Sequence, residues 1–191
     1  MSDKVYCYPD SDVLINKLNI RDSDRLHVFE RRLTMLRLLE LMDNPVEGTF
    51  DFKHLQDIHK YIFQDIYDWA GMVRTVDIAK SNMFCNVMFI ESQANELFEK
   101  LKTEKYLTGL DKDAFIKRLA FYFSEINALH PFREGNGRSQ REFIRSLALK
   151  NGYVIHFDRI TEEEMISASK KSFLCDYADM ERLLRKCIRQ K

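Results

Sequence analysis

The sequence is poor in the residues that end helices, with only six glycines and three prolines among 191 residues. It contains no apolar run approaching the roughly 18 residues that a membrane-spanning helix needs. Its N-terminus lacks the positively charged start and the apolar stretch of a signal peptide. We therefore expect long helices, and neither a secreted protein nor one inserted in a membrane.

Paired cysteines and an excess of charge are missing as well. Cys7, Cys85, Cys175 and Cys187 show no CxxC pair and no metal-ligand spacing, so we expect thiols in a reducing cytoplasm. Thirty basic and thirty acidic residues cancel, so no global field favours nucleic acid, and we expect no direct nucleic-acid partner. Any affinity for anions must therefore be local.

What is present describes one globular domain, since 45% of the residues are hydrophobic and 31% are charged, without repeats or low-complexity tracts. Periodic apolar residues and caps predict helices over residues 24–43, after Thr49 or Asp51, over 91–102, 111–129 and 138–150, after the capping box Thr161-x-x-Glu164, and from about 177. The first helix has an apolar face formed by Leu26, Phe29, Leu33, Leu36 and Leu39. We predict a single all-α, mostly helical domain over residues 1–191.

Residues 72–90 break the helical period and predict a short β-hairpin around Ser81-Asn82. Its Met83-Phe84 and Met88-Phe89 pairs are either core residues or an apolar edge on which a target segment docks as a strand.

Residues 130–141, His-Pro-Phe-Arg-Glu-Gly-Asn-Gly-Arg-Ser-Gln-Arg, concentrate the functional information. Glycines let backbone N–H groups converge on anionic oxygens, and a helix starting near Gly137 favours anions at its N-terminus. Arg138 and Arg141 are three residues apart, so they would project from one helix face, each able to bind two phosphate oxygens. With the histidine and the carboxylate, this set can hold a polyphosphate with its metal and deprotonate a hydroxyl.

Each residue of this stretch also has a structural interpretation. His130 ends a predicted helix and could cap it, although the ordinary pKa of histidine suits a general base. Glu134 could pair with Arg138, although a carboxylate beside a phosphate loop suits Mg²⁺. Asn136 alone would be a turn residue, and Phe132 would anchor the loop in the core. The other histidines are interpreted as surface or structural residues: His27, His54, His59 and His156.

The twelve residues resemble the signature of the Fic family, HxFx(D/E)GNGRxxR, with every specified position filled. The resemblance extends to residues 67–76, 152–153 and 162–172, and it is strongest to the Fic toxins of bacterial toxin–antitoxin pairs. It implies the mostly helical Fic fold, with a flap hairpin over about 72–90, and a location in the bacterial cytoplasm. The implied activity is AMPylation, the transfer of AMP from ATP to a protein hydroxyl by a protein adenylyltransferase.

The resemblance also assigns roles to individual residues. His130 is the general base, and Glu134 holds Mg²⁺. Gly135, Asn136 and Gly137 form the phosphate loop, in which Asn136 binds the α-phosphate.

Two arginines and the flap complete the implied site. Arg138 and Arg141 bind the β- and γ-phosphates, whereas Arg145 receives no role. Lys80 and Ser81 correspond to the start of the flap near the nucleotide. The chain reads Ala79-Lys80-Ser81-Asn82 where the family has Ser-Lys-Gly, so this is where it departs from the family.

The implied partners are a target protein and an antitoxin. The target presents a Tyr, Ser or Thr hydroxyl, and for toxin-like relatives it is gyrase or topoisomerase IV. Fic enzymes are held inactive by a helix carrying (S/T)xxxE(G/N), but the Glu-Gly pairs at Glu47 and Glu134 follow Asp43 and His130 four residues earlier. We therefore expect a small antitoxin that supplies the inhibitory glutamate to Arg141.

Two other functions stay open. One is a Fic-fold phosphotransferase with another donor geometry, although the kinase-like Doc branch has lysine where this chain has Gly137. The other is a non-enzymatic interaction module, although a decayed site should have lost the histidine, a loop glycine or an arginine.

Overall fold

The structure is a computed structural model that describes residues 5–79 and 83–191. Its α-helices are α1 (Ser23–Asp43), α2 (Phe52–Phe63), α3 (Ile90–Thr103), α4 (Lys112–Leu129), α5 (Asn136–Lys150), α6 (Glu162–Ser172) and α7 (Ala178–Cys187). Short 3₁₀ helices are η2 (Val87–Phe89), η3 (Lys105–Leu107) and η4 (Phe157–Arg159), and strands β1 (Tyr153–Ile155) and β2 (Ile188–Gln190) pair antiparallel. Lys80 and Ser81, with the predicted turn at Ser81-Asn82, lie outside the described residues.

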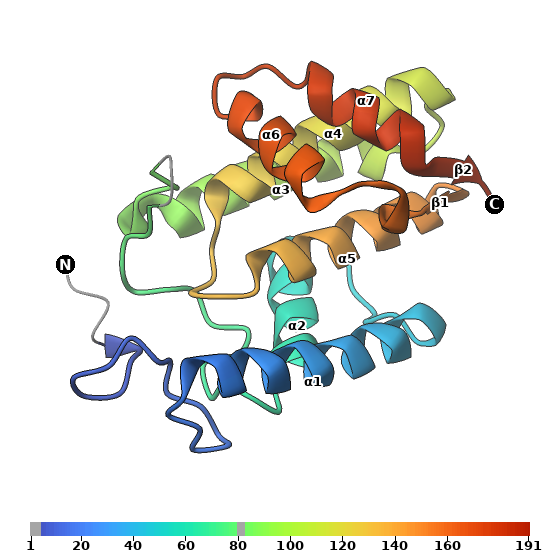
Figure 1. Ribbon diagram of the computed structural model, residues 1–191. Coiled ribbons are helices and arrows are strands. Elements are labelled where there is room, and N and C mark those ends of the chain that lie inside the picture. The colour runs from blue at the N-terminus through green and yellow to red at the C-terminus, as the bar shows by residue number, and fades with distance from the viewer. Residues whose placement is uncertain (1–4, 80–82) are drawn as a thin grey trace.

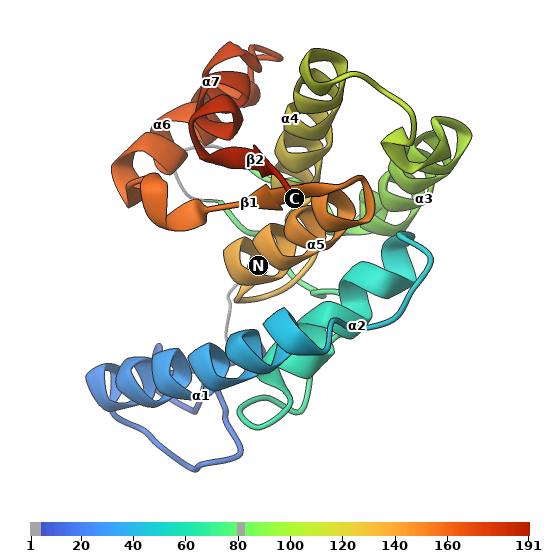
Figure 2. The ribbon, with the colours of Figure 1, turned by 90° about the vertical axis from the view of Figure 1, so that its right-hand side faces the viewer.

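Helices α4 and α5 form the centre of the domain. Helix α2 packs against α5 and α1 against α2, while α3 and α7 pack against α4. Figures 1 and 2 both show α6 and α7 on one side of α5 and α1 on the other. Large aromatic side chains fill the space between these layers, and Phe115, Phe123, Phe132 and Phe143 are almost completely buried. Residues 130–135 join the two central helices, so the motif loop lies at the core of the fold.

Side-chain caps start several helices. Asp51, one of the two predicted caps of the second helix, accepts a hydrogen bond from a first-turn N–H group of α2, and Asp22 and Asp111, which were not predicted as caps, do the same for α1 and α4. Thr161 and Glu164 form the predicted capping box of α6. The mostly helical fold is therefore confirmed, and none of the described helices is long and apolar enough to cross a membrane.

The predicted apolar face of α1 is wrong in part. Leu26 is buried, but Leu36 and Leu39 are exposed to 58% and 50%. The inward face of α1 instead contains Glu30 and Thr34, which are buried because they contact an arginine of α5. Leucines recur on both faces of this helix, so periodicity alone could not identify the inner one.

The segment 72–90 contains less strand than its pattern predicts. In its described part, Ala79 and Met83 form an isolated antiparallel bridge, and residues 87–89 form η2 instead of a second strand. Phe84 is buried, whereas Met83, Met88 and Phe89 are exposed, so the two apolar pairs do not behave alike. The small sheet forms elsewhere, between β1 and β2, where we predicted no strands.

Candidate active site

His130 lies at the junction of α4 and the motif loop. It is the C-cap of α4 in the left-handed conformation, with φ 46° and ψ 59°, and its N–H donates to the carbonyl of Ile126. A residue other than glycine is strained in this conformation, and such strain is common at functional sites. The ring of Phe84 stacks on the imidazole with a centroid distance of 3.7 Å and an interplanar angle of 13°. The histidine ring is therefore oriented by the backbone and by an aromatic neighbour.

Arg74 joins the flap segment to the motif loop. Its side chain is fully buried, and its Nε donates to the carbonyl of His130 at 2.8 Å, while its backbone N–H donates to that of Pro131. The other guanidinium nitrogens donate to the carbonyls of Val76 and Cys85. One cation thus satisfies carbonyls from three chain segments and holds them around His130. Arginine suits this position because its donors diverge in a fixed plane.

A stack of aromatic rings from α2 and the motif loop packs beneath the loop backbone and supports residues 130–135. The ring of His59, on α2, lies 3.8 Å from that of Phe132 and 4.7 Å from that of Phe63. The N–H of Gly71 donates to Nδ1 of His59, so Nε2 carries the proton and donates to the carbonyl of Glu134 at 2.9 Å. Burial lowers the pKa of His59 to about 3. His59 is therefore a neutral structural histidine, as predicted.

The start of α5 consists of a glycine in the left-handed conformation and an asparagine whose side chain bonds back to the loop. Gly135 is the N-cap, with φ +82°, and its Cα rests on Phe63, because an added Cβ would lie 2.1 Å from Cζ of that ring. Asn136 is buried, and its side chain accepts from the N–H of Phe132 and donates to the carbonyl of the same residue. In this structure the amide of Asn136 thus shapes the loop instead of pointing outward.

A cavity of about 530 Å³ opens beside His130. Gly137 and Arg141 of α5 line it, together with residues of α4, η4 and α6. Burial, followed by the charge of Arg138, lowers the pKa of Arg141, whereas Glu162 raises it. Within residues 5–79 and 83–191, no carboxylate forms an ion pair with Arg141, although Glu162 also lines the cavity. A guanidinium without an ion-pair partner in this part of the chain, near the N-terminus of α5, could bind an anion in the cavity.

Several residues of the site carry no signal in the sequence. Asn127 and Gln140 line the cavity and are buried, with 3.4 Å between Nε2 of Gln140 and Oδ1 of Asn127. Phe173 also lines it, and so does Phe84, which the sequence indicated only as a core residue or as part of a docking edge. Only Gln140 lies within the motif, at a position that the signature leaves unspecified.

The structure separates the two motif arginines. Arg138 does not line the cavity; its Nη2 lies 2.6 Å from Oε1 of Glu30 and 3.5 Å from Oε1 of Glu134. The side chain of Glu134 is 42% exposed at the edge of the loop, and its Oε1 accepts from the N–H of Gly135. The described residues contain no group of three acidic, histidine or cysteine side chains that could hold a metal ion. A lone accessible carboxylate still fits Mg²⁺, which binds proteins through one or two carboxylates together with phosphates and water.

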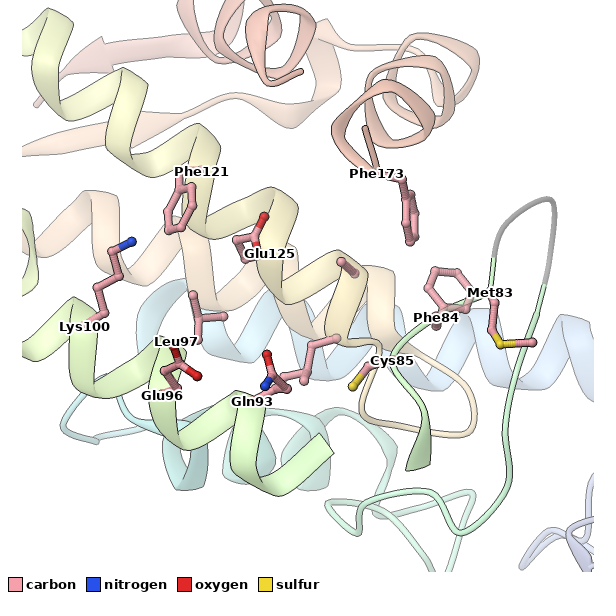
Figure 3. A pocket seen from close by; sticks show the side chains of 12 residues that line it. Met83, Phe84, Cys85, Gln93, Glu96, Leu97, Lys100, Phe121, Glu125 and Phe173 are labelled. Carbon is pink, nitrogen blue, oxygen red and sulfur yellow. The ribbon is translucent and has the colours of Figure 1, made fainter. Parts of the chain in front are cut away.

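A second cavity, of about 440 Å³, shares Phe84 and Phe173 with the first. Figure 3 shows these two rings close together with Met83 nearby, and Glu96 of α3 and Glu125 of α4 on the two sides of the cavity. Phe84, which also stacks on His130, therefore lies between this cavity and the histidine. Met83, whose side chain is exposed, lines this cavity as well.

Comparisons with known proteins agree on one family. The model of the Fic/DOC family matches residues 49–148. Protein adenylyltransferase VbhT of Bartonella schoenbuchensis is 42% identical over 97% of this chain, which spans only 39% of the length of VbhT. "Probable protein adenylyltransferase Fic" of Escherichia coli is 39% identical, with 98% of this chain and 96% of that protein covered. The N-terminal Fic domain of a VirB-translocated effector of Bartonella quintana, solved with bound ADP, has a TM-score of 0.94 and 27% identity, covering 98% of this chain and 96% of that one.

Proposed function

The chain belongs to the Fic/DOC family, and on this premise we propose that it is a protein adenylyltransferase that transfers AMP from ATP to a hydroxyl of a target protein. The observation that carries the proposal is the shared cavity of His130, Gly137 and Arg141, with no carboxylate paired to that arginine in the described part of the chain. The ADP bound to the Bartonella quintana domain and the names of the relatives support ATP as the donor.

The N-terminus of α5 and Arg141 hold the phosphates. Within the described residues, the N–H groups of Asn136 and Gly137 make no hydrogen bond, so they can donate to phosphate oxygens. Arg141 binds the terminal phosphates and so fixes the α-phosphate toward His130. Because Arg138 lies outside the cavity lining, we assign the neutralisation of the phosphate charge mainly to Arg141. Mg²⁺ on Glu134 would neutralise phosphate charge when bound.

His130 acts as the general base. The target hydroxyl attacks the α-phosphorus, the bond to pyrophosphate breaks, and the hydroxyl proton passes to the imidazole. Stacking on Phe84 and the left-handed backbone orient the ring for this transfer. The rate then comes mostly from positioning and preset electrostatics.

The target must approach from the side of Phe84 and Met83, where the second cavity adjoins the site. Figure 3 shows this second cavity between α3, α4 and residues 83–85. As the target we propose a bacterial type II topoisomerase, gyrase or topoisomerase IV, modified on tyrosine. The cytoplasm, where ATP and such enzymes occur, is the proposed location.

We further propose that the chain is the toxin of a toxin–antitoxin pair. An inhibitor that supplies a glutamate would find Arg141 unpaired within the described residues. Helix α1 adds an apolar surface for such a partner, because Met35, Leu36, Leu39 and Met42 are at least half exposed. Growth arrest on expression, relieved by a neighbouring small protein, would support this proposal.

Radioactive ATP tests the proposed reaction. The purified protein is incubated with Mg²⁺, a bacterial lysate and ATP labelled at either the α- or the γ-phosphate. We expect label on a target protein from the α-position alone, and none with His130→Ala. Label from the γ-position would make the protein a phosphotransferase, and no label from either would favour a binding module.

A further inference from the structure

A buried carboxylate of α1 holds the first arginine of the motif. The side chain of Glu30 is 9% exposed, and its Oε1 accepts from Nη2 of Arg138 at 2.6 Å. Its Oε2 accepts from the hydroxyl of Tyr67. Both carboxylate oxygens therefore have a donor, as a buried charge requires.

Tyr67 can act only as a donor in this cluster. Burial, followed by the charge of Glu30, raises the pKa of the phenol far above its ordinary value. Its ring stacks on that of Trp69 with a centroid distance of 4.3 Å. The phenol thus stays protonated and fixes the direction of the Glu30 carboxylate.

Arg138 is flanked by two carboxylates at unequal distances. The pair with Glu30 is 2.6 Å long, whereas Oε1 of Glu134 lies 3.5 Å away. Oγ1 of Thr34 lies 3.1 Å from Nη1, and the guanidinium carbon lies 4.6 Å from the centroid of the Phe63 ring. Nη2 thus donates to both carboxylates, but the contact with Glu134 is the longer and weaker of the two, and the contact with Thr34 adds to the hold of α1 on the guanidinium.

We propose that Glu30 is a positioning residue: it takes the charge of Arg138 and thereby leaves Glu134 available for a divalent cation. The inference rests on the proposed function, in which Glu134 holds Mg²⁺. Glu134 and Arg138 are four residues apart across the start of α5. Without the charge of Glu30, the partly buried guanidinium would lose its shorter ion pair, and its long contact with Glu134 would tighten into a pair that competes with the cation.

The same helix provides a matched control. Oε2 of Glu40 accepts from Nη1 of Arg37 and from the hydroxyl of Tyr61, both at 2.9 Å. The side chain of Glu40 is 49% exposed and lies outside the cavity lining. Glu40→Gln therefore removes a carboxylate charge that also faces one arginine and one tyrosine, without changing the surroundings of Glu134.

The test measures how much Mg²⁺ the protein needs to bind a fluorescent ADP analogue, a readout that is independent of turnover. In Glu30→Gln we expect the Mg²⁺ concentration at half-maximal binding to rise about fivefold, the effect of roughly one partly exposed ion pair. Glu40→Gln should stay within about twofold of the original protein, as expected for an exposed pair. Adding Arg138→Gln to Glu30→Gln should return the Mg²⁺ requirement toward the original value, because the competing cation is gone.

The outcomes separate this inference from the proposed function. If Glu134→Gln raises the Mg²⁺ requirement and Glu30→Gln does not, the positioning role of Glu30 is refuted and the metal role of Glu134 stands. If Glu134→Gln leaves the Mg²⁺ requirement unchanged, the metal role of Glu134 is refuted, and with it the inference that depends on that role. The inference is also overturned if Glu30→Gln with Arg138→Gln needs as much Mg²⁺ as Glu30→Gln alone. Glu30 would then affect the site by stabilising the fold and not by holding Arg138. Should Glu30→Gln fail to fold, Tyr67→Phe replaces it, and an unchanged Mg²⁺ requirement in that variant counts against the proposal.

Discussion

Gly135 is the position of the motif where the structure tolerates a side chain least. Its φ is +82°, in the left-handed region, and an added Cβ would lie 2.1 Å from Cζ and 2.3 Å from Cε2 of Phe63. The ring of Phe63 is fully buried, so it cannot swing into solvent. Gly135→Ala therefore meets two separate costs, one in the backbone and one in the packing.

The two costs can be estimated separately. A left-handed conformation costs an alanine about 1–2 kcal/mol. Forcing an extra methyl into a packed core costs about 1–3 kcal/mol more. We therefore expect Gly135→Ala to lower the free energy of unfolding by about 2–5 kcal/mol.

Gly109 isolates the backbone cost. It has nearly the same φ, +83°, but an added Cβ would have no atom within 4 Å. Gly109→Ala should show the backbone cost alone, about 1–2 kcal/mol. Urea unfolding of both variants measures the difference, which is the contact with Phe63. A side chain smaller than phenylalanine at position 63 should relieve that contact. We therefore expect the double variant Gly135→Ala with Phe63→Leu to lose less stability than the sum of the two single variants.

Equal losses in Gly135→Ala and Gly109→Ala would refute this reasoning. They would mean that the loop moves away from Phe63 at little cost, and that the ring does not support the N-terminus of α5. Adenylyl transfer by Gly135→Ala, measured at a temperature where the variant is folded, is the second readout. We expect it to fall, because a loop displaced from Phe63 also displaces the N–H groups at the start of α5.

Three further predictions concern individual side chains. His130→Ala should lower kcat at least about 100-fold and leave nucleotide binding intact, since it removes the base alone; unchanged turnover would exclude the mechanism. Arg141→Ala should weaken binding of the ADP analogue about 10- to 100-fold, the range for a charge-assisted hydrogen bond, and calorimetry that shows no change would place the phosphates elsewhere. The unfolded chain protonates His59 near pH 6.5, but the folded chain only near about 3, so stability is lost as the pH falls through this window, by about 1.4 kcal/mol per unit. His59→Gln should show a shallower loss between pH 6.5 and 5 in urea unfolding, and identical slopes would contradict a neutral buried imidazole.

Local signals in the sequence predicted most helix starts, because capping is a local interaction. Asp51 and Thr161 accept from N–H groups three residues away, so the cap and its helix can be recognised together. The small sheet escaped prediction, since β1 pairs with a strand at the end of the chain and each strand has only three residues. The pairing of Glu30 with Arg138 spans 108 positions, and no pattern near either residue indicates it.

The two arginines of the motif show the limit of spacing as a guide to function. Their three-residue spacing predicted a common direction, yet Arg141 lines the cavity while Arg138 is turned to Glu30 on α1. Three residues on a helix differ by about 60° in direction, and the packed elements on either side turn this difference into two separate environments. One guanidinium is neutralised by a buried carboxylate, and the other has no ion-pair partner within the described residues. A motif identifies which side chains are available, but the charges around each one decide which of them is left to bind phosphate.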